Sequence, residues 1–364
     1  MISPKPYIKT LAPYQPGLPI EVVARSYGLQ PDAIIKLNSN ENPHGPSPAA
    51  VEAMRHALQN SHRYPDTFSL TRLLSEQLGV SGDSLILGNG SNDIIDLIAR
   101  TFLGNNDESI VSQYAFAMYE VAIQTVGASS HIVPANNYGH DLEAMKNALA
   151  AKTKVVWIAN PNNPTGTFIS YADLENFITQ VPKNCIIVLD EAYYEYLEPS
   201  ERHNTALWPA KYPNVIIIRT FSKIHGIAGL RVGYAIAAPH IAELINRVRL
   251  PFTNNHLAVV AASAALLDHK FIEMSRKTNA NERRKIEQQL TLHGIDFIPS
   301  KGNFITLRIS DSAVYDSLLR QGIIVRPLDN YGLSGWIRVS IGLPQENDCF
   351  INTLIPLVSS AKKK

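Results

Sequence analysis

Several features that mark particular classes of protein are scarce in this sequence of 364 residues. Its 2 cysteines, Cys185 and Cys349, are too few and too far apart to predict a disulfide framework. The 33 Lys and Arg residues balance 32 Asp and Glu residues, so no net charge attracts the chain to nucleic acid or to an anionic membrane. The longest apolar run, residues 258–267, is much shorter than the roughly 20 residues that a membrane span needs.

The start of the chain also lacks a targeting pattern. Residues 1–17 contain no apolar stretch of the kind that forms a signal peptide. Cys185 lies in an apolar run, where a buried, unreactive side chain is expected. These absences predict a soluble protein of the cytoplasm, with no nucleic-acid partner and no membrane contact.

Short β-branched runs alternate with amphipathic helical patterns over the first two thirds of the chain. In residues 92–103, for example, Ile94, Ile95, Ile98 and Phe102 recur at helical spacing. Apolar strands separated by helices predict an α/β fold, whose large domain has a mostly parallel, seven-stranded sheet covered by helices on both faces. The seven runs are residues 84–90, 108–114, 129–135, 154–161, 185–192, 214–222 and 231–237.

The pattern changes near residue 250. A charged amphipathic helix is predicted over 280–294, and a further helix is predicted from 344 onward. Between them, residues 302–309, 322–328 and 335–343 are typical of strands. We therefore expect a large domain over 37–250, and a smaller α+β domain formed by 251–364 together with the N-terminal segment 1–36.

Polar motifs follow the predicted strands directly, at the sheet edge where ligands bind in such folds. The glycine-rich turn at 88–90 precedes Ser91, which we place as the N-cap of the helix over 92–103. Free backbone N–H groups at that point suit a phosphate, although an ordinary capped turn also fits. In NPNNPTG, residues 160–166, two prolines stiffen the chain around Asn163. Its amide is then free to donate, although the composition also fits a plain turn.

Two further strands end in ionisable side chains. Asp190 ends the strand over 185–192, and a buried carboxylate is costly unless a cation or a hydrogen-bond donor faces it. The alternative is that Asp190 caps the next segment. Lys223 follows the strand over 214–222, where it either reaches solvent or is a desolvated amine that bonds covalently to an aldehyde. Arg231 is suited to bidentate contact with a phosphate.

Taken together, these residues specify one cofactor. Pyridoxal phosphate requires a lysine for its aldehyde, a carboxylate for its ring nitrogen, donors for its phenolic oxygen and a cup for its phosphate. Residues of these four kinds occur along the chain at Ser91, Asn163, Asp190 and Lys223.

Four strings of the sequence resemble the fold-type I, class I/II aminotransferases: NPNNPTG (160–166), DEAYYEY (190–196), TFSKIHGIAGLRVGY (220–234) and WIRVSIG (336–342). With LAPYQPG (11–17), LNSNENPHGPSP (37–48) and HRYPD (62–66), the chain is most similar to the histidinol-phosphate aminotransferases. The resemblance covers nearly the whole chain.

The resemblance implies a role for each matching residue. Lys223 is expected to hold the cofactor and to move the substrate proton, Asp190 to face the ring nitrogen, and Asn163 and Tyr193 to bind the phenolic oxygen. Phe116 is expected to stack on the ring, at a position where the family usually has tyrosine. The phosphate ligands would be Gly90, Ser91, Asn92, Thr220, Ser222 and Arg231.

The resemblance also implies partners and substrates. Tyr64 would reach the cofactor phosphate of a partner subunit, which predicts a homodimer with shared active sites. Arg338 would bind the anionic group of the substrate, with Arg326 and Tyr14 beside it. The implied reaction is reversible transamination between L-histidinol phosphate and 2-oxoglutarate, which gives imidazole acetol phosphate and L-glutamate in histidine biosynthesis.

Three alternatives remain open from the sequence. An aromatic or broad-specificity amino-acid aminotransferase would use the same apparatus with a different pocket. A threonine-phosphate decarboxylase would share the scaffold and a phosphate-binding arginine. A nonenzymatic binder of pyridoxal or a nucleotide on a doubly wound sheet would need only the glycine turn, but it would have no use for the pair of Lys223 and Asp190.

Overall fold

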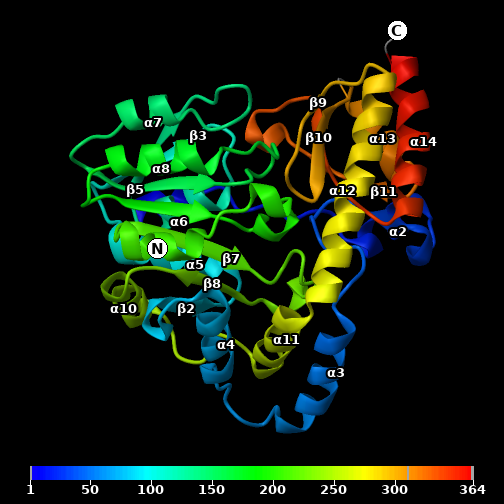
Figure 1. Ribbon diagram of the computed structural model, residues 1–364. Coiled ribbons are helices and arrows are strands. Elements are labelled where there is room, and N and C mark those ends of the chain that lie inside the picture. Colours follow the sequence, from blue (N-terminus) through cyan, green and yellow to red (C-terminus); the bar gives the residue numbers. More distant parts are fainter. Residues whose placement is uncertain (1, 310, 362–364) are drawn as a thin grey trace.

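The computed structural model describes residues 2–309 and 311–361. Its large part is built on one seven-stranded sheet with the strand order β2-β8-β7-β6-β5-β3-β4, which confirms the predicted α/β class (Figure 1). β8 runs antiparallel to both of its neighbours, β2 and β7, and the other adjacent strands pair in parallel. The strands are β2 (Leu85–Gly88), β3 (Glu108–Ser112), β4 (Ser129–Val133), β5 (Thr153–Ala159), β6 (Ile186–Asp190), β7 (Val215–Thr220) and β8 (Gly233–Ile236).

Alternating side chains bury both faces of this sheet. Along β6, Ile187 and Leu189 belong to one apolar core, while Ile186 and Val188 belong to the other. Successive side chains of a strand point to opposite faces, so a sheet covered on both sides needs the continuous apolar runs seen in the sequence. One core includes residues of α4 (Phe68–Leu78), α7 (Leu142–Asn147), α8 (Tyr171–Gln180), α9 (Trp208–Lys211) and α11 (His256–Leu267). The other includes residues of α5 (Ser91–Phe102), α6 (Met118–Thr125) and α10 (Pro239–Val248).

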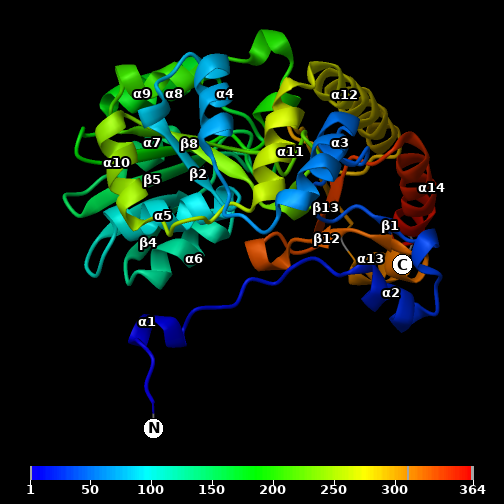
Figure 2. The ribbon, with the colours of Figure 1, turned by 90° about the horizontal axis from the view of Figure 1, so that it is seen from below.

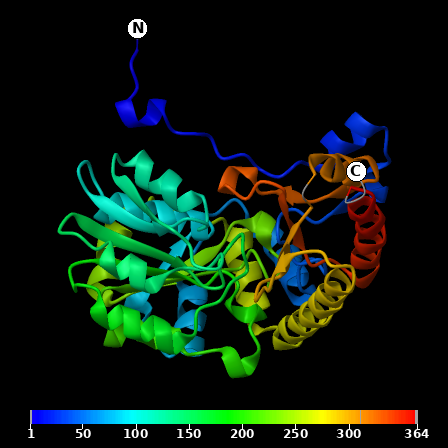
Figure 3. The ribbon, with the colours of Figure 1, turned by 90° about the horizontal axis from the view of Figure 1, so that it is seen from above.

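The smaller part has its own core and a four-stranded antiparallel sheet, with the order β12-β13-β10-β9 (Figure 3). The run predicted over 322–328 divides into β11 and β12, and β11 pairs with β1 of the N-terminal segment. Neither β1 nor β9 was predicted. The strands are β1 (Ile35–Lys36), β9 (Phe297–Ile298), β10 (Phe304–Arg308), β11 (Ile323–Ile324), β12 (Arg326–Pro327) and β13 (Trp336–Ser340). The helices are α2 (Ile20–Tyr27), α12 (His269–Leu292), α13 (Ser312–Arg320) and α14 (Pro344–Ala361).

The N-terminal segment connects the large and small parts. The N-terminal segment runs from α1 (Pro6–Lys9), which packs beside α6 of the large part, to α2 of the small part (Figure 2). The Gln124 side-chain amide donates to the Tyr7 carbonyl oxygen at 3.1 Å and holds α1 there. Helix α11 packs against α3 (Pro48–Ala57) and α4, within the core of the large sheet. The division of the chain at residues 36/37 and 250/251 stays a prediction.

In the part of the chain that the structure describes, no helix combines the length and the apolar character that crossing a bilayer requires.

Candidate active site

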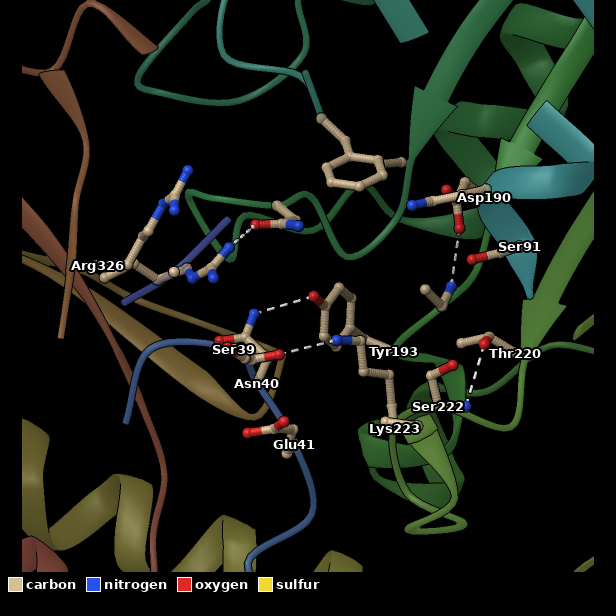
Figure 4. A pocket seen from close by; sticks show the side chains of 18 of the residues that line it. Ser39, Asn40, Glu41, Ser91, Asp190, Tyr193, Thr220, Ser222, Lys223 and Arg326 are labelled. Atoms are coloured by element: carbon tan, nitrogen blue, oxygen red, sulfur yellow. Dashed lines mark hydrogen bonds between the residues drawn. The ribbon is translucent and has the colours of Figure 1, made fainter. Parts of the chain in front are cut away.

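A cavity of about 260 Å³ lies at the carboxyl end of the large sheet, where the small part faces it (Figure 4). Asp190 ends β6 and Thr220 ends β7, while Asn163 follows β5 and Ser91 follows β2 through a short turn. This is the edge at which open α/β sheets bind ligands. The predicted residues that line the cavity are Tyr14, Ser91, Asn92, Phe116, Asn163, Asp190, Tyr193, Thr220, Ser222, Lys223, Arg231, Arg326 and Arg338.

Lys223 directs its amine into this cavity. Nζ donates to the Ser39 carbonyl oxygen at 3.2 Å and lies 5.6 Å from the centroid of the Tyr193 ring. Burial lowers the pKa of Lys223 to about 7, and the charges of Arg338 and Arg231 act in the same direction. Near neutral pH a large fraction of this side chain is therefore the free amine. Of the two interpretations of Lys223, the structure favours the desolvated amine.

Asp190 is buried and faces a donor rather than a cation. Its Oδ2 accepts a hydrogen bond from the Tyr119 hydroxyl at 2.8 Å, and its Oδ1 accepts one from the Ala192 backbone N–H at 3.1 Å. Burial raises the pKa of Asp190 to about 6, although these two hydrogen bonds lower it in part. No cationic side chain among the described residues forms an ion pair with Asp190, so a positively charged ligand atom in the cavity would stabilise its ionised form.

The sequence analysis did not identify Tyr119 as a functional residue. It projects from α6, stacks on Trp157 with ring centroids 5.1 Å apart, and is fully buried. Its ring also makes an edge-to-face contact with Phe116, which lines the cavity. The available signal was its place three residues after Phe116, which precedes the start of α6 at Met118.

A buried ion pair between Arg219 and Glu191 links the ends of strands β6 and β7. Arg219 donates from NH2 to Glu191 Oε2 at 2.9 Å, and both side chains are almost completely buried. Thr205 and Tyr171 donate to the same carboxylate at 2.7 and 3.1 Å. Because Glu191 follows Asp190 and Arg219 precedes Thr220, this pair joins β6 to β7 at the point where their side chains enter the cavity.

The glycine turn and Arg231 bring together donors that suit an anion, but the predicted N-cap is wrong. Gly90, not Ser91, is the N-cap of α5, because the turn needs a backbone with φ 87° and ψ 169°, which is essentially restricted to glycine. A Cβ atom at Gly90 would lie 2.1 Å from Arg231 NH2, so only glycine leaves room for this guanidinium. Arg231 NH1 donates to Ser222 Oγ at 3.1 Å. With the start of α5, these groups offer donors for one phosphate.

At the opposite end of the cavity, Arg326 and Arg338 occupy directly opposed positions on β12 and β13. Their residues are only 9% and 8% exposed, and among the described residues neither forms an ion pair with an acid. Instead, Arg338 donates to Asn163 Oδ1 at 2.5 Å and to the Asn38 carbonyl oxygen at 2.9 Å. Like charges opposed on neighbouring strands repel each other, so this pair forms a site for an anion.

Tyr14 and Tyr64 occupy different environments. The Arg326 guanidinium carbon lies 5.8 Å from the centroid of the Tyr14 ring, and Arg326 NH2 donates to the Gln15 carbonyl oxygen at 2.8 Å. Tyr64 is 77% exposed and stacks on Phe252, outside the cavity of its own chain. Its predicted contact with a partner subunit stays a prediction.

The sequence analysis quoted residues 37–48 but gave them no function. In the structure Asn38, Ser39 and Asn40 line the cavity. The Asn38 and Ser39 carbonyl oxygens accept hydrogen bonds from Arg338 and Lys223, and the Asn40 side-chain amide donates to the Tyr193 hydroxyl at 3.0 Å. The segment therefore touches both ends of the site.

The sequence model of the family described as aminotransferase class I and II matches residues 32–354. The chain belongs to this family. Histidinol-phosphate aminotransferase 1 of Dechloromonas aromatica (strain RCB) is 49% identical over 349 residues, which are 96% of each chain. The crystal structure of histidinol-phosphate aminotransferase from Sinorhizobium meliloti, in complex with pyridoxal-5'-phosphate, superposes with a TM-score of 0.88 at 27% identity and covers 98% of this aminotransferase and 97% of that chain.

A second solved structure shows how widely this fold is shared. L-threonine-O-3-phosphate decarboxylase from Porphyromonas gingivalis superposes with a TM-score of 0.79 at 23% identity, covering 91% of this aminotransferase and 100% of that chain. At this identity the likeness shows the fold alone. The side chains of the cavity must therefore carry any argument about the reaction.

Proposed function

We propose that this aminotransferase exchanges the amino group between L-histidinol phosphate and 2-oxoglutarate, with pyridoxal phosphate as its cofactor. The products would be imidazole acetol phosphate and L-glutamate, in a reversible reaction of histidine biosynthesis. The name of the relative that shares 49% of its residues supports this substrate. The observation that carries the proposal is the buried pair of Arg326 and Arg338, which has no acidic partner among the described residues.

The residues of the cavity fit pyridoxal phosphate. The buried carboxylate of Asp190 would face the ring nitrogen, the Arg231 cup would hold the phosphate, and Lys223 would bond to the aldehyde. Phe116 would lie against the ring, and Tyr193 and Asn163 would donate to its phenolic oxygen. When bound, the cofactor supplies an electron-accepting ring that weakens the bonds to the carbon bearing the amino group.

Lys223, Asp190 and Asn163 would then control the transfer of the substrate proton and the charges on the cofactor. With its pKa lowered to about 7 by burial, Lys223 can accept a proton at Nζ and return it near neutral pH. Asp190 would hold positive charge on the ring nitrogen, since its carboxylate already accepts hydrogen bonds from Tyr119 and Ala192. The Oδ1 atom of Asn163 is occupied by Arg338, so its amide N–H groups are left to donate into the cavity.

The end of the cavity that carries Arg326 and Arg338, here called the arginine end, favours a doubly charged anionic group. Two guanidiniums at directly opposed strand positions can share the oxygens of a phosphate, and the carboxylates of 2-oxoglutarate can use the same donors in the other half-reaction. Phenylalanine carries a single carboxylate and an uncharged side chain, so it supplies one negative charge for two guanidiniums. The arginine pair therefore favours histidinol phosphate over phenylalanine, and it suits threonine phosphate equally well.

The enzyme would act as a homodimer. The stacked pair of Tyr64 and Phe252 is exposed on the single chain, at 77% and 58%. An exposed aromatic pair is typical of a contact surface, and Tyr64 would supply a phenol to the partner subunit's cofactor phosphate. Action in the cytoplasm stays a prediction.

The proposal is tested by steady-state assays with histidinol phosphate, phenylalanine and threonine phosphate, each with 2-oxoglutarate as the acceptor. We expect glutamate formation to be fastest with histidinol phosphate, and we expect no release of CO₂. Faster glutamate formation from phenylalanine would contradict the substrate assignment, whereas CO₂ release from threonine phosphate would support the decarboxylase.

Two variants test the role of Lys223 in the same assay. Lys223→Ala should abolish turnover while the protein still binds some cofactor, and Lys183→Ala, at an exposed lysine, should leave turnover unchanged. Full activity of Lys223→Ala would contradict the role of Lys223, whereas absence of turnover in the native protein would favour a protein that merely binds pyridoxal.

A further inference from the structure

Asn40 is buried in an unusual backbone conformation at the centre of the site. It is 1% exposed and has a φ of 55°, in the left-handed region that residues other than glycine adopt uncommonly. Asparagine tolerates this region better than most residues do, but at some cost in free energy. A backbone of this kind persists where the surrounding contacts determine it, so the contacts of the Asn40 side chain indicate its function.

The Asn40 side chain joins two hydroxyl groups that come from different parts of the molecule. Its Nδ2 donates to the Tyr193 hydroxyl oxygen at 3.0 Å, on the side of the large sheet (Figure 4). Its Oδ1 accepts from Ser340 Oγ at 3.0 Å, and its backbone N–H donates to the same Oγ at 2.8 Å. Ser340 ends β13, two residues after Arg338.

These contacts fix the direction of every hydrogen bond. Because Ser340 Oγ accepts from the Asn40 backbone, the Ser340 proton is left to donate to Oδ1. That bond places Oδ1 toward Ser340 and Nδ2 toward Tyr193, which settles the orientation of the amide. The Tyr193 oxygen therefore accepts, and its hydroxyl makes no second hydrogen bond with any of the described residues. The Tyr193 proton is free to point into the cavity.

We infer that Asn40 is a positioning residue, which acts through Tyr193 by keeping that hydroxyl a donor toward an oxyanion bound in the cavity. The inference rests on the proposed function, because the phenolic oxygen of the cofactor would be the acceptor. Since Ser340 lies on the strand that carries Arg338, Asn40 also ties the orientation of Tyr193 to the arginine end of the site.

The choice of variant at Asn40 separates the effect of the side chain from the effect of the backbone conformation. Asn40→Gly removes the amide and tolerates the positive φ, whereas alanine at this position would add backbone strain. The Asn40 carbonyl oxygen, which accepts from Asn303 Nδ2 at 3.0 Å, is retained in the glycine variant. Asn106→Gly is the matched control, because Asn106 also has a positive φ (78°) but lies in an exposed loop before β3, whereas the cavity lies at the opposite, carboxyl end of the sheet.

The experiment is a pH titration of the absorbance of each holoenzyme after reconstitution with pyridoxal phosphate. A donor to the phenolic oxygen of the cofactor stabilises the high-pH form of the cofactor, in which that oxygen carries the most negative charge. Loss of the donor should therefore raise the midpoint pH of the spectral transition. We expect Asn40→Gly to raise the midpoint by about one pH unit, the size of one charge-assisted hydrogen bond. Ser340→Ala, which frees the amide to rotate, should shift it in the same direction by less. Asn106→Gly should not shift it.

A double-mutant cycle with Tyr193→Phe decides whether the effect passes through the tyrosine. In the Tyr193→Phe background, Asn40→Gly should cause no further shift. A shift of equal size in both backgrounds, or none in the native background, would overturn the inference. If Asn40→Gly fails to fold, Ser340→Ala takes its place in the same cycle. If the native protein forms no cofactor absorbance band at all, the proposed function fails instead, so the two failures are distinguishable.

Discussion

The two ends of the cavity are built in different ways. At the sheet end, Asp190 and Thr220 are the last residues of β6 and β7, so the β-ladder sets their positions. At the other end, Arg326 and Arg338 are long side chains oriented by the carbonyl oxygens of Gln15 and Asn38, which lie outside regular secondary structure. A β-ladder therefore places the backbone at both ends, but at the arginine end irregular segments orient the side chains.

The charges of the two ends differ as well. The sheet end presents a buried carboxylate, Asp190, that has no cationic partner among the described residues, and the other end presents two guanidiniums without an acid. A ligand that fills both ends must therefore carry positive charge at one side and negative charge at the other. A pyridinium bound with an anionic substrate has this distribution.

The largest expected effect comes from removing the Lys223 amine at the sheet end of the cavity. Lys223→Met removes the nucleophile and the proton carrier together, so kcat should fall by at least about 10⁴-fold. The same change should raise the melting temperature of the cofactor-free protein below pH 7, because a buried ammonium is removed. Steady-state kinetics and thermal unfolding measure the two effects, with Lys183→Met as the control. A stabilised variant that retains high turnover would contradict the account.

The next largest effect is expected at the arginine that touches the sheet end. Arg338→Lys keeps the positive charge but loses the planar guanidinium, which donates hydrogen bonds to Asn163 Oδ1 and to the Asn38 carbonyl oxygen. We expect kcat/KM for histidinol phosphate to fall by about 100-fold, which corresponds to roughly 3 kcal/mol for charge-assisted bonds to one group. The fall should be much smaller for an amine without an anionic group. An equal loss for both amines would indicate a structural defect instead.

A smaller effect is expected for Arg326→Lys. Among the described residues this arginine makes one hydrogen bond, to the Gln15 carbonyl oxygen, so a lysine can keep most of its attraction for an anion. We expect KM for histidinol phosphate to rise by about 10-fold while kcat changes little, consistent with the loss of one hydrogen bond. A loss equal to that of Arg338→Lys would show that the two arginines act as one unit.

The pH dependence of Lys223 gives the most specific effect. Its pKa is lowered from 10.5 to about 7, so the unfolded chain binds more protons than the folded one between these values. The free energy of unfolding of the cofactor-free protein should therefore gain a contribution that rises with pH from about 7 to 10.5, and Lys223→Met should remove it. Urea unfolding across this range measures the difference. A slope that is the same in both proteins would contradict the lowered pKa.

The sequence predicted the sheet end of the site well. Apolar runs that cover both faces of a parallel sheet have a clear signature, and a polar residue after such a run must lie at the edge where ligands bind. This reasoning placed Asp190 and Lys223 on the cavity, and all seven strands of the large sheet were found.

The rest could not be predicted because it depends on contacts between distant segments. Asn40 binds Tyr193 and Ser340 across 153 and 300 residues, and β1 pairs with β11 across the whole chain. No local sequence pattern predicts which distant segments will pair. The N-cap at Gly90 was missed for a different reason: serine is a common N-cap, but the approach of Arg231 requires a residue without a Cβ atom one position earlier.

The central claim, that the Lys223 amine and the Asp190 carboxylate hold opposite sides of one cofactor, is tested most directly by crystals grown with pyridoxal phosphate. The account predicts continuous electron density from Lys223 Nζ to the cofactor, with the ring nitrogen facing Asp190. Density for a cofactor that is not attached to Lys223, or a carboxylate turned away from the ring, would contradict it.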